Sequence, residues 1–194
     1  EVLVKAGGKS AYPRAFPIAP GIPGDSVSNM AVLPYGSLDS LAWIEKNAAD
    51  IAAVIVEPVQ SRHPELQPFE FLRELRAITT RAQTALVFDE VVTGFRTHPG
   101  GMQAVLDIRA DMATYGKVVG GGLPVGILAG SARYMDALDG GMWQFGDDSI
   151  PEVAPTYFAG TFVRHPLVLA ACGAVLDHLR EQGPKLQERL ATRT

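Results

Sequence analysis

The stretch that decides the fold reads TALVFDEV and spans residues 84–91. Its length and apolar composition are typical of a strand buried on both faces of a parallel sheet. Asp89 stands where this strand should end, and functional groups gather at the carboxyl ends of parallel strands. The stretch therefore predicts a buried strand that carries an acid to a functional edge of the sheet.

Apolar runs on both sides of this stretch extend the pattern. Strands are expected over residues 52–59, 84–91, 111–115 and 125–129, and helices over residues 37–50, 68–83, 131–138 and 166–182. The second of these helices should bury one apolar stripe, formed by Phe71, Leu72, Leu75 and Ile78. Residues 1–37 hold five prolines and should be irregular, and residues 140–156 should form a loop. Strands that alternate with helices predict an α/β fold with a mostly parallel, buried sheet flanked by helices.

Length and composition exclude several classes of protein. The 194 residues suit one domain, and 47% hydrophobic with 20% charged residues is a globular composition. The net charge of -4 provides no positive field, so we expect no nucleic acid partner. No apolar run has membrane-spanning length and no signal peptide is visible, so we expect no membrane association and a cytoplasmic location. The single Cys172 fits a reducing compartment. Because the chain begins at Glu1 without Met, we expect it to be part of a longer protein.

A second stretch, TYGKVVGGGLP over residues 114–124, places Lys117 in a glycine-rich turn one strand after Asp89. A lysine amine can hold the aldehyde of pyridoxal phosphate (PLP) as a Schiff base, and an acid paired with the pyridinium nitrogen keeps the ring electron-accepting. Burial in a tight glycine turn, where a flat ligand could sit, would favour the neutral amine that this chemistry needs. Two simpler interpretations remain: Asp89 caps the next turn, and Lys117 is a solvated surface charge.

A third stretch, FAGTF over residues 158–162, precedes the helix expected from residue 166. Backbone amides of a glycine turn at Gly160, together with the hydroxyl of Thr161, could contact a phosphate group. An ordinary loop threonine is the alternative.

A nucleotide-hydrolysing enzyme is the rival interpretation of Asp89. Residues 86–90 also look like the Mg²⁺-binding strand of a P-loop ATPase, and Gly8, Lys9 and Ser10 look like the tail of its phosphate-binding loop. That loop needs a glycine where this chain has Leu3, and it needs a helix where this chain has prolines. We expect no metal site, because the four histidines lie at no recurrent metal spacing: His63, His98, His165 and His178.

Four motifs stand in a fixed order along the chain. They are VIVEPV over residues 54–59, DEV-x-TGFR over residues 89–96, GK-x-x-GGG-x-P-x-G over residues 116–126, and GTF over residues 160–162. Together they resemble the class III, fold type I, PLP-dependent aminotransferases. Among these the chain is similar to the glutamate-1-semialdehyde 2,1-aminomutases. It looks closer still to the aminotransferase domains of hybrid polyketide–nonribosomal peptide synthetases, through residues 59–68 and 139–162.

The resemblance implies roles for five residues. Asp89 would pair with the pyridinium nitrogen, and Val91 would pack on a face of the ring. Lys117 would form the internal aldimine and move the proton during transamination. Thr161, with Gly160, would bind the cofactor phosphate of the neighbouring subunit, which implies a homodimer.

The resemblance also sets limits and alternatives. Glu57 is a further candidate beyond the direct cofactor contacts, whereas Val92 replaces a glutamine that many relatives use on the cofactor hydroxyl. Residues 1–194 would form the central part of the large domain, without its N-terminal segment and the C-terminal small domain. The implied reaction moves an amino group from an amino acid donor to a keto acceptor, with a β-ketoacyl thioester on a carrier protein as the acceptor. The aminomutase reaction, and a fragment that binds no cofactor alone, are the alternatives.

Overall fold

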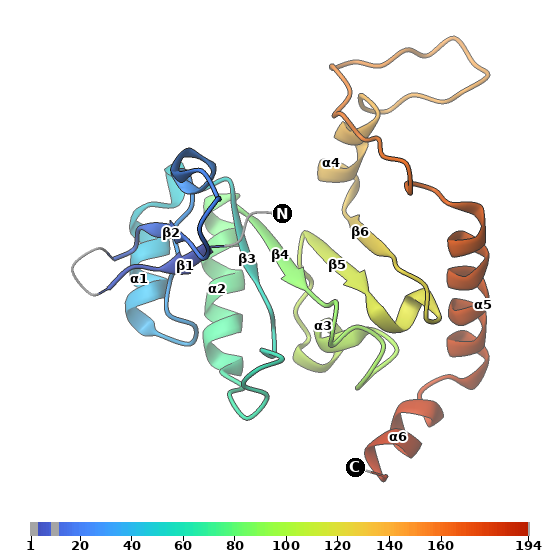
Figure 1. Cartoon of the computed structure of the whole chain (residues 1–194), viewed down its shortest axis with the longest axis horizontal. Coiled ribbons are helices and arrows are strands. Elements are labelled where there is room, and N and C mark those ends of the chain that lie inside the picture. The colour runs from blue at the N-terminus through green and yellow to red at the C-terminus, as the bar shows by residue number, and fades with distance from the viewer. Residues whose placement is uncertain (1–3, 9–11, 194) are drawn as a thin grey trace. The chain divides into compact units, whose positions relative to one another are not determined.

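The computed structural model describes residues 4–8 and 12–193 of the chain (Figure 1). It divides into two compact units, Glu1–Lys46 and Asn47–Thr194.

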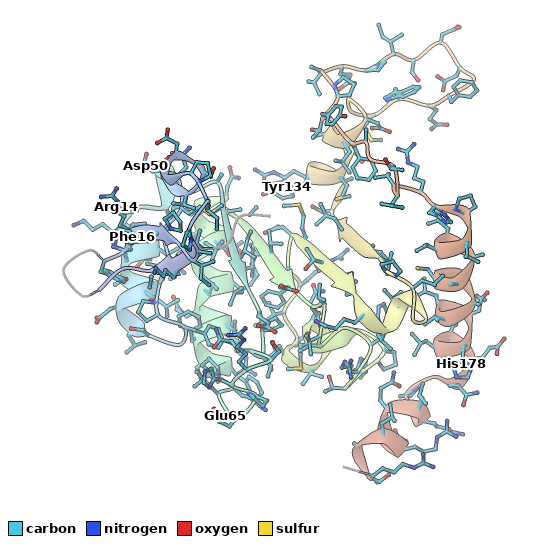
Figure 2. The ribbon with its side chains drawn as sticks, in the orientation of Figure 1. Arg14, Phe16, Asp50, Glu65, Tyr134 and His178 are labelled. Atoms are coloured by element: carbon cyan, nitrogen blue, oxygen red, sulfur yellow. The ribbon has the colours of Figure 1, made fainter. Side chains whose placement is uncertain are left out.

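The first unit contains a short strand pair and a helix. Strand β1 (Val4–Ala6) pairs antiparallel with β2 (Ala15–Pro17), so the expectation of a wholly irregular segment is wrong here. Pro17 is tolerated because it is the last residue of an edge strand, where its missing N–H breaks no ladder. The guanidinium of Arg14 lies 5.3 Å from the centre of the Phe16 ring (Figure 2). Lys9 and Ser10, which the ATPase interpretation requires, lie outside the described residues.

The remainder of the first unit agrees more closely with the prediction from the sequence. A 3₁₀ turn, η2 (Gly24–Val27), precedes α1 (Leu38–Lys46). The predicted start of α1 is confirmed, since the Ser37 carbonyl accepts hydrogen bonds from the amides of Ser40 and Leu41. Leu41 and Ile44 are buried on one side of this helix.

The second unit is built on a four-stranded sheet. Its strands are β3 (Ala53–Val56), β4 (Ala85–Asp89), β5 (Met112–Gly116) and β6 (Gly126–Gly130), in the order β3-β4-β5-β6. The first three are parallel and β6 is antiparallel to β5. Helix α2 (Phe69–Ala82) connects β3 to β4. The predicted α/β class with a mostly parallel sheet is confirmed, as are the four expected strands.

The core lies between β4 and α2. Four successive residues of β4, Ala85 to Phe88, are buried, and the predicted stripe of α2 is buried with them. The expectation that β3 is buried is wrong, because Ile55 is 72% exposed. Strand β3 is the terminal strand of this sheet, with β4 as its one neighbour, so its outward side chains remain uncovered within this unit.

The helices beyond the core include two that the sequence did not predict. These are α3 (Gly101–Leu106), between β4 and β5, and α6 (Lys185–Ala191). Four further helical elements fall within predicted helices: η3 (Ala48–Asp50), α4 (Ala132–Met135), η5 (Asp136–Leu138) and α5 (Pro166–Gln182). Helix α5 ends at Gly183, with φ at +56°, as predicted.

Residues 139–165 form no helix or strand and project as a long loop between α4 and α5 (Figure 1). Among the described residues, none of the helices has the length and apolar character needed to cross a membrane. The cytoplasmic location stays a prediction.

Candidate functional site

The candidate site lies where the parallel strands end. Because β3, β4 and β5 run in the same direction, their carboxyl ends share one edge of the sheet. Glu57 follows β3, Asp89 ends β4, and Lys117 follows β5. In the ladder, Asp89 is the Cα partner of Thr114, three residues before Lys117. The structure therefore places these three predicted residues on one edge.

Asp89 uses one of its carboxylate oxygens locally. Its Oδ1 accepts hydrogen bonds from the Val91 amide at 3.0 Å and from the Thr114 hydroxyl at 3.2 Å. The capping alternative is thus correct for Oδ1. No hydrogen bond to Oδ2 is found within residues 4–8 and 12–193, and the residue is only half-buried. Asp89 therefore has a fixed orientation and one oxygen available to a ligand.

Val91 lies against the strand end that leads into Lys117. A Cβ placed on Gly116 would stand 3.4 Å from Val91 Cγ1 and 3.1 Å from the Val125 carbonyl oxygen. A Cβ at position 116 would therefore press on the Val125 carbonyl oxygen and touch Val91. The apolar side chain of Val91 therefore lies beside Gly116, the residue that precedes Lys117.

Lys117 begins the 3₁₀ turn η4 (Lys117–Gly120) with φ at +49°. This left-handed conformation costs a residue with a Cβ about 1–2 kcal/mol, and such strain clusters at functional sites. Its side chain is exposed, so the expected burial is wrong for this structure. In the described part of the chain no carboxylate pairs with its amine.

The glycines after Lys117 explain that exposure. A Cβ on Gly120 would meet Val125 Cγ1 at 2.9 Å, and one on Gly121 would meet Val175 Cγ2 of α5 at 3.0 Å. Gly121 also has φ at +59°, which favours glycine. The predicted tight packing is present, but it seats the turn on the chain's own Val125 and α5 and leaves Lys117 outside.

Three other predicted residues have no hydrogen bond to Asp89 or Lys117 within the described residues: Glu57 at the same sheet edge, and Gly160 and Thr161 on the long loop. Glu57 Oε1 accepts a hydrogen bond from the Ser61 amide at 2.9 Å, which closes the turn after β3. Gly160 and Thr161 are exposed on the long loop, and no hydrogen bond within the described residues joins Thr161 to Asp89 or Lys117. The loop also exposes large apolar side chains: Met142, Phe145, Ile150, Tyr157, Phe158 and Phe162. The cofactor roles of Glu57, Gly160 and Thr161 stay predictions.

Glu90 is the residue that the sequence reasoning missed. It follows Asp89 and is 1% exposed, and its carboxylate accepts hydrogen bonds from the amides of Met102 and Gln103, the Gln103 side chain and the Thr93 hydroxyl. Burial and the Glu90 charge raise the pKa of Tyr115, and a hydrogen bond from Gln103 partly offsets this. The spacing of Met102, Val105 and Leu106 was the available signal for α3, which the preceding glycines obscured.

The sequence as a whole matches one family. The family described as Aminotransferase class-III matches residues 29–193, and the chain belongs to it. The predicted class III membership is thereby confirmed, and PLP is the cofactor of this family. The ATPase interpretation of Asp89 is wrong, because the chain belongs to this family instead.

Individual relatives point to amino-group chemistry. A glutamate-1-semialdehyde 2,1-aminomutase of Pyrobaculum aerophilum is 41% identical over 197 residues, covering 98% of this chain and 44% of that protein. An omega-transaminase from Sphaerobacter thermophilus superposes with a TM-score of 0.79 and 34% identity, over 97% of this chain and 41% of that one. A transaminase with PLP bound gives a TM-score of 0.73 and 27% identity, over 87% and 38%.

These comparisons confirm the predicted similarity to the aminomutases and the fold type. The similarity to synthetase-embedded domains stays a prediction. The chain spans less than half the length of the relatives it matches. The residues present fit PLP in two respects: Asp89 offers an oriented carboxylate oxygen, and Lys117 offers an unpaired amine at the adjacent strand end.

Proposed function

We propose that the protein transfers an amino group from an amino acid donor to a keto acceptor, with PLP held between Asp89 and Lys117. The observation that carries this proposal is the shared strand edge, where an oriented carboxylate and a free amine occupy adjacent strand ends. A PLP enzyme needs these two groups, and the chain belongs to a family that uses them.

Each side chain would contribute a defined step. PLP, when bound, supplies an electron-accepting ring. Asp89 Oδ2 would accept a hydrogen bond from the ring nitrogen, and its negative charge would keep that nitrogen protonated. Lys117 Nζ would hold the aldehyde carbon between turnovers and carry the proton to and from the substrate carbon during the reaction. Val91 would pack against the ring and exclude water from one face.

Thr161 and Gly160 would serve a second copy of the protein. Both are exposed on a loop that carries large apolar side chains without cover. Exposed apolar side chains of this kind are typical of a segment that becomes buried when two subunits associate. In a homodimer the Thr161 hydroxyl of one subunit would contact the cofactor phosphate in the other. Equilibrium sedimentation of the full-length protein tests this point, and a monomer that binds PLP at full strength would contradict it.

Borohydride trapping tests the site itself. The full-length protein should bind PLP with visible absorbance, and reduction should leave the cofactor attached to Lys117 after proteolysis and mass spectrometry. Lys117→Arg should abolish the attachment, whereas the matched control Lys185→Arg, on α6, should retain it. Attachment of the cofactor to any other lysine would refute the assignment.

The acceptor distinguishes two versions of the reaction. We propose a β-ketoacyl thioester on a carrier protein, because residues 59–68 and 139–162 resemble synthetase-embedded aminotransferase domains. The aminomutase reaction is the second candidate, favoured by the 41% identity with the Pyrobaculum aerophilum enzyme. Incubation with an amino acid and a β-ketoacyl thioester should consume the donor in the first case. In the second, glutamate-1-semialdehyde should isomerise without a separate donor.

A non-catalytic role for residues 1–194 alone is the alternative of another class. Lys117 and Thr161 are exposed, and the chain covers less than half of its relatives, so we propose that further sequence completes the cofactor site. Titration with PLP should show binding to the full-length protein and none to residues 1–194. Equal affinity for both would contradict this proposal.

A further inference from the structure

The Glu90 carboxylate is a buried negative charge without a cation beside it. Within the described residues no Lys, Arg or His forms an ion pair with it, although it is 1% exposed. A buried charge of this kind is costly unless hydrogen bonds replace its hydration. Four donors do so: Met102 N at 2.8 Å, the Thr93 hydroxyl at 3.0 Å, and the amide and side chain of Gln103 at 3.3 Å each.

The backbone of Glu90 is tied as firmly as its side chain. Its amide donates to the Thr114 carbonyl at 3.0 Å, which extends the β4–β5 ladder by one bond. Its carbonyl accepts from the Gly94 amide at 2.8 Å. Gly101 adopts φ at +65° beneath the carboxylate, where a Cβ would stand 2.7 Å from Oε1 and closer still to Oε2. One residue thus joins β4, β5, the following turn and α3.

The same network reaches the strand that carries Lys117. Gln103 Nε2, which donates to Glu90, also donates to the Tyr115 hydroxyl at 3.1 Å. The Tyr115 ring packs at 5.5 Å from the Phe95 ring, and a Cβ on Gly94 would meet it at 2.8 Å. Tyr115 precedes Lys117 by two residues, so Gln103 links the buried carboxylate to the end of β5.

Glu90 also stands between two residues of the site. Asp89 and Val91 flank it, and Asp89 is oriented partly by the Val91 amide. We infer that Glu90 is a positioning residue: its buried carboxylate sets the separation and orientation of Asp89 and Lys117. This inference rests on the proposed function and assigns Glu90 no contact with cofactor or substrate.

The variant Glu90→Gln tests the inference with almost no change of shape. An amide NH₂ in place of Oε1 faces two donors of Gln103, and in place of Oε2 it faces the Met102 amide, while the Thr93 hydroxyl can turn to accept from it. In either orientation at least one of the four hydrogen bonds is therefore lost and an N–H group meets another N–H group. Gln103→Leu is the second variant, since it cuts the link to Tyr115 while the Thr93 and Met102 bonds remain. Leu75→Ala is the control, because it loosens the core on α2 without touching the network.

Two readouts separate positioning from stability in the full-length protein loaded with PLP. Glu90→Gln and Gln103→Leu should weaken the visible circular dichroism of bound PLP and lower kcat at least about tenfold at saturating substrate, because small misplacements at a reacting centre are expensive. Leu75→Ala should lower the melting temperature but leave both quantities unchanged per bound PLP. Unchanged dichroism and kcat in Glu90→Gln, or a parallel loss in Leu75→Ala, would overturn the inference.

Hydrogen exchange of the PLP-free protein tests the network independently of activity. Glu90→Gln should speed exchange at the amides of Met102 and Gly94 and, through the Tyr115 link, at Gly121, whose amide closes the Lys117 turn on the Val118 carbonyl. Leu75→Ala should not speed exchange selectively at Gly121. If Glu90→Gln leaves Gly121 unchanged, the inference fails. Failure of the unaltered protein to bind PLP would instead refute the proposed function.

Discussion

Replacing Gly101 by alanine perturbs the buried Glu90 network at its tightest point. The glycine has φ at +65°, and an added Cβ would stand 2.7 Å from Glu90 Oε1. The left-handed conformation costs alanine about 1–2 kcal/mol. Moving the carboxylate aside breaks a hydrogen bond to a charged group, which costs about 1.5–3 kcal/mol. We therefore expect Gly101→Ala to lower the free energy of unfolding by roughly 2.5–5 kcal/mol.

Gly173→Ala is the matched control, since it makes the same chemical change inside α5. No heavy atom lies within 4 Å of a Cβ built at Gly173. Alanine is the better helix former there, so this variant should gain about 0.5–1 kcal/mol of stability. The two glycines thus predict effects of opposite sign.

Urea unfolding followed by far-ultraviolet circular dichroism measures both variants on the same protein, with and without PLP. A Gly101→Ala protein that unfolds within about 1 kcal/mol of the unaltered one would show that the carboxylate tolerates the methyl group. The reasoning about the buried network would then be wrong.

Three further predictions address the site, the core and the pH dependence. Asp89→Asn should retain PLP but lower kcat by on the order of a hundredfold to a thousandfold, because the ring nitrogen loses its charged partner. Steady-state kinetics measures this effect, and an undiminished kcat would show that Asp89 has no part in the mechanism. Leu75→Ala should cost about 2–5 kcal/mol in urea unfolding, since the side chain is 1% exposed, and a loss under 1 kcal/mol would show that the core readily collapses. The pKa of Tyr115 is raised in the folded protein, so the unfolded phenol loses its proton first as pH rises. Stability should be full below about pH 10 and fall above it, and Tyr115→Phe should reduce that fall; equal slopes between pH 9 and 11 would contradict the assignment.

The local sequence predicted most of the elements. Apolar periodicity placed β4 and α2 within a residue or two of their observed bounds, and Pro166 and Gly183 marked the two ends of α5. These signals are short-range: a strand or helix that buries one face repeats its apolar residues at a fixed spacing. The proximity of Asp89 to Lys117 could be predicted for the same reason, since Asp89 ends one apolar strand and Lys117 directly follows the next.

Elements that depend on distant contacts were not predictable in this way. Helix α3 begins at a glycine with positive φ, and its first amides are capped by Glu90, eleven residues earlier. Strand β3 has an apolar sequence yet lies at the end of the sheet with Ile55 exposed. Strand order and caps of this kind arise from packing between segments and leave no periodic trace in the sequence.

The sequence by itself determined the α/β class and the family, and it predicted the two residues that would hold the cofactor. Only the tertiary structure decided how these two residues are presented. It showed that Asp89 shares one oxygen with its own backbone, and that Lys117 is held outside by glycines seated on Val125 and α5. It also showed that Glu90 is the buried link between the two strand ends. The reason is physical: residue type sets what a side chain can do, whereas burial, hydrogen-bond partners and orientation are set by neighbours far apart in the chain.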